Sequence, residues 1–148
     1  MATINPYLNY NGNAEEAFNF YKSVFGGELS MIVRFKDMPH HEQPLSEIDA
    51  NKIMHIALPI GRGNVLMATD FIESIGQKMK EGNRYSVSIN AESKEEANNL
   101  FHGLSAGGEI DVPIADSPWG SYFGLFKDKF GIQWMVDFDP NFNGQSHS

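Results

Sequence analysis

The stretch AEEAFNFYKSVFGGEL at residues 14–29 decides the fold, because its pattern returns at residues 94–110 as KEEANNLFHGLSAGGEI. Both copies begin with two glutamates, repeat apolar side chains at helical spacing and end in Gly-Gly-Glu followed by an aliphatic residue. Glutamates suit the first turn of a helix, and glycines tolerate the positive φ that often ends one. The sequence therefore predicts two related helices, at residues 15–25 and 94–104.

Polar residues just before each copy are the expected helix starts. Asn13 and Ser93 can each accept a hydrogen bond from the first turn of the helix that follows. One strand-like run precedes each helix and three follow it, bounded by turn residues. These runs are 4–10, 29–35, 53–58 and 64–68 in the first half, and 85–89, 110–114, 122–126 and 133–138 in the second.

Each half is therefore a βαβββ unit, and two such units predict an α+β fold. We expect a first module at 1–70, a linker at 71–83, a second module at 84–139 and a disordered tail at 140–148, all within one structural domain. Residues 37–51 form a polar loop, and a mobile lid is one role open to it.

That loop contains a tempting set of metal-binding side chains, His40, His41 and Glu42. Adjacent side chains point apart on an extended chain, so the three do not converge on one ion. A solvated loop is the better interpretation.

Composition excludes several classes of protein. The chain of 148 residues has a net charge of −8, whereas nucleic-acid binding needs clustered lysines and arginines, so we expect no nucleic-acid partner. No apolar run approaches the roughly 18 residues of a membrane helix, and no secretory signal is visible, so we expect no membrane association. The absence of cysteine excludes disulfides and thiolate chemistry, and a cytoplasmic location is the expectation.

Three stretches carry a family resemblance: INPYLNYNGNAEEAFNFYKSVFGGELS from Ile4, KIMHIALPIGRGNVLMATD from Lys52 and WGSYFGLFKDKFGIQWMV from Trp119. Over about residues 3–138 they resemble the PhnB-like branch of the glyoxalase, bleomycin-resistance and extradiol-dioxygenase superfamily, also called the vicinal oxygen chelate superfamily. The resemblance implies two βαβββ modules whose mixed sheets form a half-open cup. It also implies a homodimer with a small-molecule ligand in the cup.

The resemblance further locates four positions where enzymes of this superfamily hold a divalent metal through histidine or glutamate. The matching residues here are Pro6, Met67, Arg84 and Met135, the last in an Asp-x-x-Gly pattern whose Asp128 is retained. Proline has no ligand atom, arginine stays protonated, and thioethers suit soft Cu(I) rather than Mg, Mn, Fe, Zn or Ni. We therefore expect no metal and no other cofactor.

The same region supplies the candidate ligand-binding residues. Two methionines make it apolar and adaptable, and an aromatic pair can form a wall of a pocket. Strand alternation puts Gln133 and Asp137 on the same side as Met135, and an arginine can clamp a carboxylate or phosphate. Core packing, a dimer contact or a solvated position is the alternative for each. The expected ligand-binding residues are Arg84, Trp119, Phe123, Met67, Met135 and Gln133.

Two functions follow as hypotheses. The first is a metal-free protein that binds a small, partly apolar molecule; the acidity of the chain suits a cation, whereas Arg84 suits an anion. The second is a glyoxalase-like lyase or isomerase, either metal-dependent under a different ligand alignment or metal-free with His55 as base. A structural His55 and a purely structural dimer also remain open.

Relatives of this branch also carry the label of 3-demethylubiquinone methyltransferase. Methyl transfer needs a bound methyl donor, and the sequence has no glycine-rich strand–loop–helix typical of such a site. We therefore do not expect methyl transfer.

Overall fold

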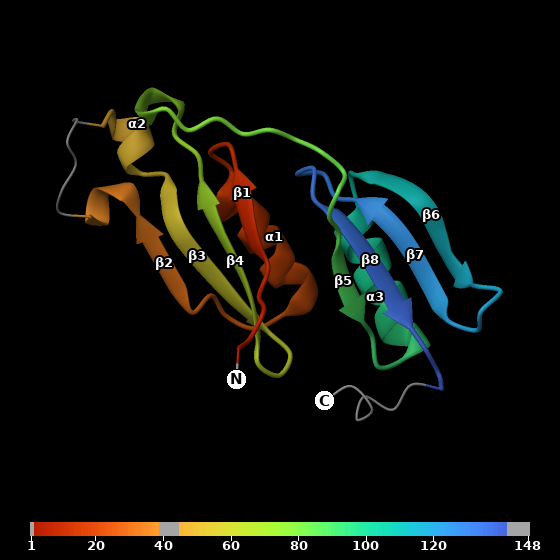
Figure 1. The fold of residues 1–148 in the computed structure, drawn as a ribbon. Coiled ribbons are helices and arrows are strands. Elements are labelled where there is room, and N and C mark those ends of the chain that lie inside the picture. The colour runs from red at the N-terminus through yellow and green to blue at the C-terminus, as the bar shows by residue number, and fades with distance from the viewer. Residues whose placement is uncertain (1, 39–44, 142–148) are drawn as a thin grey trace. The chain divides into compact units, whose positions relative to one another are not determined.

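The computed structural model describes residues 2–38 and 45–141. The chain divides into two compact units, residues 1–81 and 82–148, and each is built in the order β–α–β–β–β (Figure 1). None of the helices in the described ranges is long and apolar enough to cross a membrane. The histidine-rich part of the 37–51 loop, with His40 and His41, lies outside the described residues, as does the tail from residue 142.

The first unit has one long helix and a four-stranded mixed sheet. Its elements are β1 (Tyr7–Tyr10), α1 (Ala14–Phe25), β2 (Met31–Arg34), β3 (Ile53–Ile60) and β4 (Asn64–Asp70), with short helical turns η1 (Phe35–Asp37), α2 (Glu47–Ala50) and η2 (Glu73–Ile75). The strand order is β1-β4-β3-β2; β1 runs parallel to β4 and the other neighbours are antiparallel.

The second unit repeats this plan. Its elements are β5 (Val87–Asn90), α3 (Lys94–Ser105), β6 (Glu109–Asp116), β7 (Tyr122–Lys127) and β8 (Gln133–Phe138). The strand order is β5-β8-β7-β6, with β5 parallel to β8 and the other neighbours antiparallel. The equivalent strand order in the two units confirms that the sequence repeat is a structural repeat.

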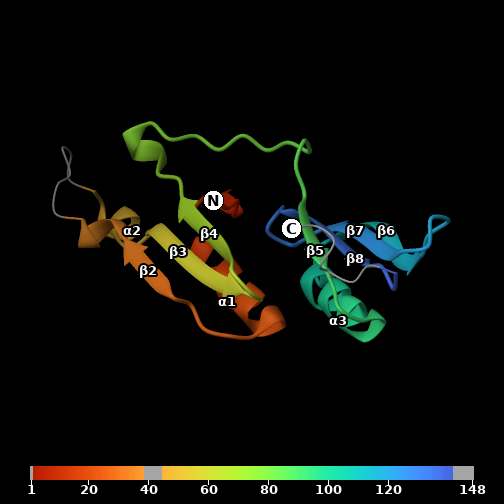
Figure 2. The same cartoon turned by 60° about the horizontal axis from the view of Figure 1, so that its bottom comes forward.

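The core of each unit lies between its long helix and one face of its sheet (Figure 2). In the first unit, alternate residues such as Ile56 and Leu58 are fully buried on the side that contacts α1. In the second, Trp134 is buried and the ring of Phe126 meets that of Phe101 on α3 at 5.2 Å. Burying each such side chain contributes about 1.5–3 kcal/mol, which fixes the face that each strand turns inward.

The predicted α+β fold of βαβββ modules with open mixed sheets is confirmed, while the ends of several elements and one loop differ. The first strand begins at Tyr7 rather than residue 4, because Pro6 has no N–H for the ladder. The polar loop at 37–51 is partly helical, because Ser46 caps α2 by accepting a hydrogen bond from Asp49 N. A helix of four residues is too short to give a periodic pattern.

The two predicted helix caps have different outcomes. Ser93 caps α3 as expected, accepting a hydrogen bond from Glu96 N at 3.0 Å. The prediction for Asn13 is wrong, since its side chain makes no cap hydrogen bond. The start of α1 is capped instead by Asp70 at the end of β4, whose carboxylate accepts a hydrogen bond from Ala14 N at 2.9 Å.

Candidate functional site

One face of the second sheet is turned away from α3, the only long helix among the described residues of this unit. Tyr122 and Phe138 pair across β7 and β8, and the Tyr122 hydroxyl donates to Asn98 of α3, so this pair faces the helix. The next pair, Phe123 and Asp137, must face the opposite way because side chains alternate along a strand. We call this opposite side the β7–β8 face.

Three successive cross-strand pairs form the β7–β8 face, because directly paired residues point to the same side of a sheet. One end is aromatic and acidic, the middle is apolar, and the other end carries an amide and a cation. In that order the pairs are Phe123–Asp137, Leu125–Met135 and Lys127–Gln133. All six side chains are half-buried.

The structure brings four of the predicted ligand-binding residues together on this face. Met135 and Gln133 lie on it directly, as does Phe123. The ring of Trp119 lies 5.3 Å from that of Phe123 and is 68% exposed. The two rings are therefore in contact and much of the indole is exposed, while a role in a pocket wall stays a prediction.

Arg84 lies in the segment that leads into β5 and is exposed. It makes no hydrogen bond or ion pair within residues 2–38 and 45–141. Nearby in sequence, Ser86 Oγ donates to Gln133 Oε1 at 3.5 Å, which places this segment at the amide end of the β7–β8 face.

Met67 occupies the matching position in the first sheet. It pairs with Ala57 of β3 and with Tyr7 of β1, just as Met135 pairs with Leu125 of β7 and Ser88 of β5. The repeat thus sets the two methionines at equivalent places in their own sheets. The carbonyl of Pro6 accepts a hydrogen bond from Met67 N at 3.1 Å, so these two predicted positions are neighbours.

His55 also points to the side of the first sheet that carries Met67. Its ring lies 5.8 Å from the ring of Tyr7, tilted by 37°. His55 is half-buried and has no side-chain hydrogen bond to any described residue. A half-buried imidazole beside a tyrosine ring can act as a base or contact a ligand, and it can equally serve only to pack against Tyr7.

The donor set at the four positions that the resemblance assigns to a metal does not fit a hard divalent cation. Pro6 offers no side-chain donor, Met67 and Met135 offer thioethers, and Arg84 carries a fixed positive charge. Within the described ranges, no three side chains of His, Asp or Glu gather closely enough to hold a metal ion.

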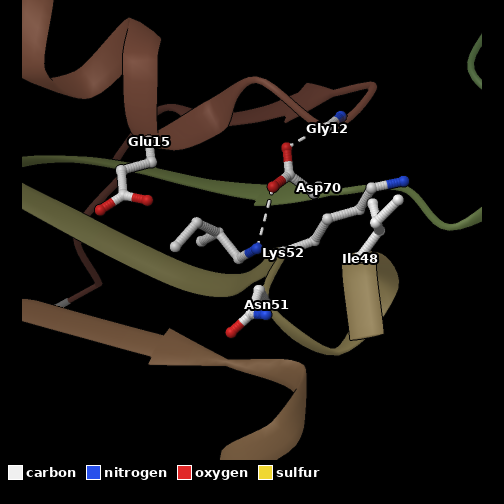
Figure 3. Close-up of a pocket in the computed structure, with 7 residues that line it drawn as sticks. Gly12, Glu15, Ile48, Asn51, Lys52 and Asp70 are labelled. Atoms are coloured by element: carbon white, nitrogen blue, oxygen red, sulfur yellow. Dashed lines mark hydrogen bonds between the residues drawn. The ribbon is translucent and has the colours of Figure 1, made fainter. Parts of the chain in front are cut away.

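A separate pocket of about 200 Å³ lies in the first unit (Figure 3). The buried carboxylate of Asp70 accepts hydrogen bonds there from three backbone N–H groups, those of Gly12, Ala14 and Ile53. The pocket is lined by Gly12, Glu15, Ile48, Asn51, Lys52, Ile53 and Asp70. Its carboxylate is thus already committed to holding the start of α1 against β3 and β4.

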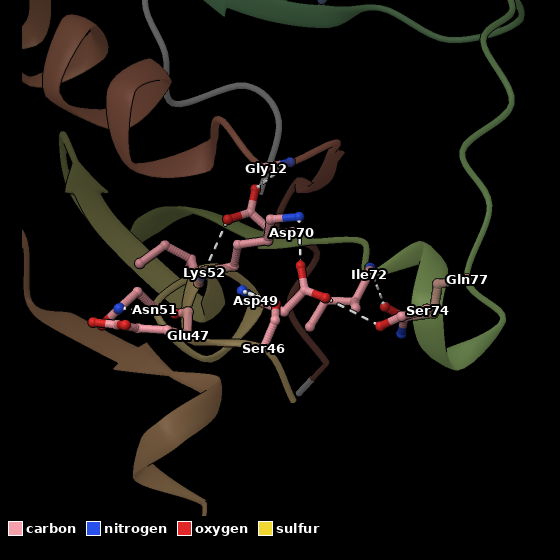
Figure 4. Close-up of polar contacts among 11 residues, drawn as sticks. Gly12, Ser46, Glu47, Asp49, Asn51, Lys52, Asp70, Ile72, Ser74 and Gln77 are labelled. Carbon is pink, nitrogen blue, oxygen red and sulfur yellow. Dashed lines mark hydrogen bonds and ion pairs between the residues drawn. The ribbon is translucent and has the colours of Figure 1, made fainter. Parts of the chain in front are cut away.

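The other charged groups around this pocket are also paired. Arg34 holds Glu15 through two contacts of 3.0 and 2.8 Å, and this hydrogen bonding lowers the pKa of Glu15 in spite of the opposing effect of desolvation. Lys52 binds Asp49 at 2.9 Å and lowers the pKa of Asp49, with Ser74 as a further donor (Figure 4). The network braces α2 and η2 against the sheet, so we assign it a structural role.

Two features of the site were not predicted from the sequence. Leu125 and Lys127 complete the β7–β8 face, but only the register between β7 and β8 identifies them. Residues 122–127, YFGLFK, are apolar or glycine up to Lys127, so their sequence indicates a strand but not which side chains share a face.

Comparison with known proteins assigns the chain to one protein family. The family model described as 3-demethylubiquinone-9 3-methyltransferase matches residues 2–137. Protein PA1353 from Pseudomonas aeruginosa is 37% identical, with a TM-score of 0.82 over 94% of this chain and 98% of that one. A putative 3-demethylubiquinone-9 3-methyltransferase, the PhnB protein from Bacillus cereus, is 27% identical, with a TM-score of 0.73 over 93% of this chain and 99% of that one.

A glyoxalase-related enzyme from Fulvimarina pelagi shares the fold at 19% identity, with a TM-score of 0.61 over 95% of this chain and 90% of that one. The expected glyoxalase-like architecture is therefore confirmed. All of these matches extend over nearly the whole chain.

Proposed function

The chain belongs to the family described as 3-demethylubiquinone-9 3-methyltransferase, the PhnB-like branch of the glyoxalase and bleomycin-resistance superfamily, and on that basis we propose that it binds a small, partly apolar molecule on the β7–β8 face without a metal ion. The observation that carries this proposal is the pair Leu125–Met135 at the centre of that face. Ligand sites are typically apolar with a few polar groups at the edges, and this face has that composition.

The family description names a methyltransferase, but the residues here favour binding over methyl transfer. The segment between β1 and α1, with Gly12, is the connection closest to a cofactor-binding strand–loop–helix. The N–H groups of Gly12 and Ala14 are already bound to the Asp70 carboxylate. A cofactor that needed these N–H donors would have to displace a buried carboxylate from them, which is unfavourable.

Ligand binding at this face should affect the indole N–H NMR signals of the two tryptophans differently. We expect benzyl alcohol, a small neutral probe, to shift the indole N–H signal of Trp119 saturably in a ¹H–¹⁵N spectrum. The signal of Trp134 should move little, because that indole is buried and donates to Asp128 at 2.9 Å. Met135→Asp should weaken the probe at least about fivefold, because a charge in the apolar centre must be desolvated by the ligand.

Met38→Asp is the matched control, since Met38 is exposed in the first unit and should leave the affinity unchanged. Equal weakening by both variants, or no saturable shift of Trp119 in the parent, would contradict the proposal.

A metal-free lyase or isomerase with His55 as base is the second candidate. The observation that favours it is the half-buried imidazole against Tyr7, on the side of the sheet that carries Met67. General bases contribute about 10²–10⁴-fold to rate, so His55→Gln should abolish most turnover of any substrate found while leaving its KM similar. A variant with parental kcat would remove His55 from catalysis.

Arg84 supplies a cation at the amide end of the face, where it can hold an anionic group. Arg84→Ala should then weaken the binding of phenylacetate, and the loss of affinity should be smaller at high salt because salt screens the charge.

Exposed apolar side chains of the first sheet, such as Tyr7 and Met31, support a homodimer, which light scattering tests. Cell fractionation tests the cytoplasmic location.

A further inference from the structure

We propose that the aromatic and acidic end of the β7–β8 face binds the positively charged nitrogen of an organic ammonium compound. This inference rests on the proposed function and names the class of ligand. It concerns Trp119, Phe123 and Asp137, all in the second unit.

Asp137 lies between Phe123 on β7 and Asn90 on β5, directly paired with each in the register of the sheet. Trp119 adds a second ring, 5.3 Å from Phe123 and tilted by 50° to it. Two aromatic rings and a carboxylate therefore border one patch of the same sheet face.

Asp137 makes no ion pair or side-chain hydrogen bond with any residue that the structure describes. Lys127 is the cation among the six paired residues of this face, and the Leu125–Met135 pair separates it from Asp137 along the strands. The carboxylate is half-buried yet available to a positive charge brought by a ligand.

An organic cation is attracted to the faces of tryptophan and phenylalanine and to a carboxylate at the same time. A carboxylate repels an anionic ligand, and a neutral ligand gains only the apolar contact. The net charge of −8 adds a long-range attraction for cations. The apolar body of the ligand would then lie along the Leu125–Met135 pair.

Three probes of similar size test this inference on the full chain at constant ionic strength: benzyltrimethylammonium, benzyl alcohol and phenylacetate. The affinity of each probe is measured from the saturable shift of the Trp119 indole signal. We expect the cation to bind at least about fivefold more tightly than the alcohol. Asp137→Asn should weaken the cation about fivefold and remove its advantage over the alcohol.

Asp116→Asn is the matched control, because it makes the same change in net charge at a residue paired with Tyr122 on the α3 side of the sheet. It should change the affinity for the cation less than twofold. An unchanged Trp134 indole signal verifies that each variant is folded.

The outcomes separate this inference from the proposed function. If benzyl alcohol shifts Trp119 but the cation binds no tighter, or if both aspartate variants weaken the cation equally, the ammonium site is wrong and the proposed function stands. If none of the three probes shifts Trp119 saturably, both are wrong.

Discussion

Asp70→Ala is expected to lower the free energy of unfolding by about 3–5 kcal/mol, as measured by urea denaturation. The side chain is 1% exposed, and its two oxygens accept hydrogen bonds from the backbone of Gly12, Ala14 and Ile53. Alanine leaves three N–H groups without this acceptor. Water entering the adjacent pocket of about 200 Å³ can recover part of the loss, which keeps the estimate below the sum of three buried donors.

Asp37→Ala provides the control for this result. The carboxylate of Asp37 is exposed and accepts one backbone hydrogen bond, from Arg34 N at 2.9 Å. Its removal should cost about 1 kcal/mol or less. A loss below about 1 kcal/mol for Asp70→Ala as well would mean that Asp70 does not hold α1 to the sheet.

Asp128→Ala is expected to have a similar effect in the second unit, lowering the free energy of unfolding by about 3–4 kcal/mol. Asp128 is 3% exposed and binds the backbone N–H groups of Phe130 and Ile132 and the indole of Trp134, at 2.8, 3.0 and 2.9 Å. These bonds close the turn between β7 and β8 and fix the buried side of β8.

The same substitution should also weaken benzyl alcohol at the β7–β8 face, because Met135 faces outward only while its neighbour Trp134 is held inward. Asp111→Ala, at an exposed position on β6, is the control and should change the free energy of unfolding by no more than about 0.5 kcal/mol. A stable Asp128→Ala variant with parental probe binding would show that the turn does not determine which side chains form the β7–β8 face.

Local periodicity was sufficient to predict part of the site. Residues alternate sides along a strand, so a buried Trp134 fixes Gln133, Met135 and Asp137 on the other side of β8 before any partner strand is known. The repeat likewise predicted which strand would follow which helix. These features depend only on neighbours along the chain.

Features that depend on register could not be predicted. Leu125 lies opposite Met135 because the turn at Asp128 brings Asp128 N to the carbonyl of Ile132 at 2.8 Å. A turn longer or shorter by one residue would exchange the two faces of β7. The cap of α1 by Asp70 joins residues 56 positions apart, whereas Asn13 offered a local cap that the fold does not use. Arg84 precedes β5, so strand alternation does not determine its direction.

The central proposal is that this protein binds a small molecule without the metal ion that its resemblance to glyoxalase-type enzymes would imply. The most direct measurement is a calorimetric titration of untagged, chelator-treated protein with Ni, Zn, Mn and Fe(II), with elemental analysis of the protein as purified. We predict no stoichiometric binding, because Pro6, Met67, Arg84 and Met135 supply no ligand set for these ions. One equivalent of tightly bound metal would contradict the account and make metal-dependent glyoxalase chemistry the leading assignment.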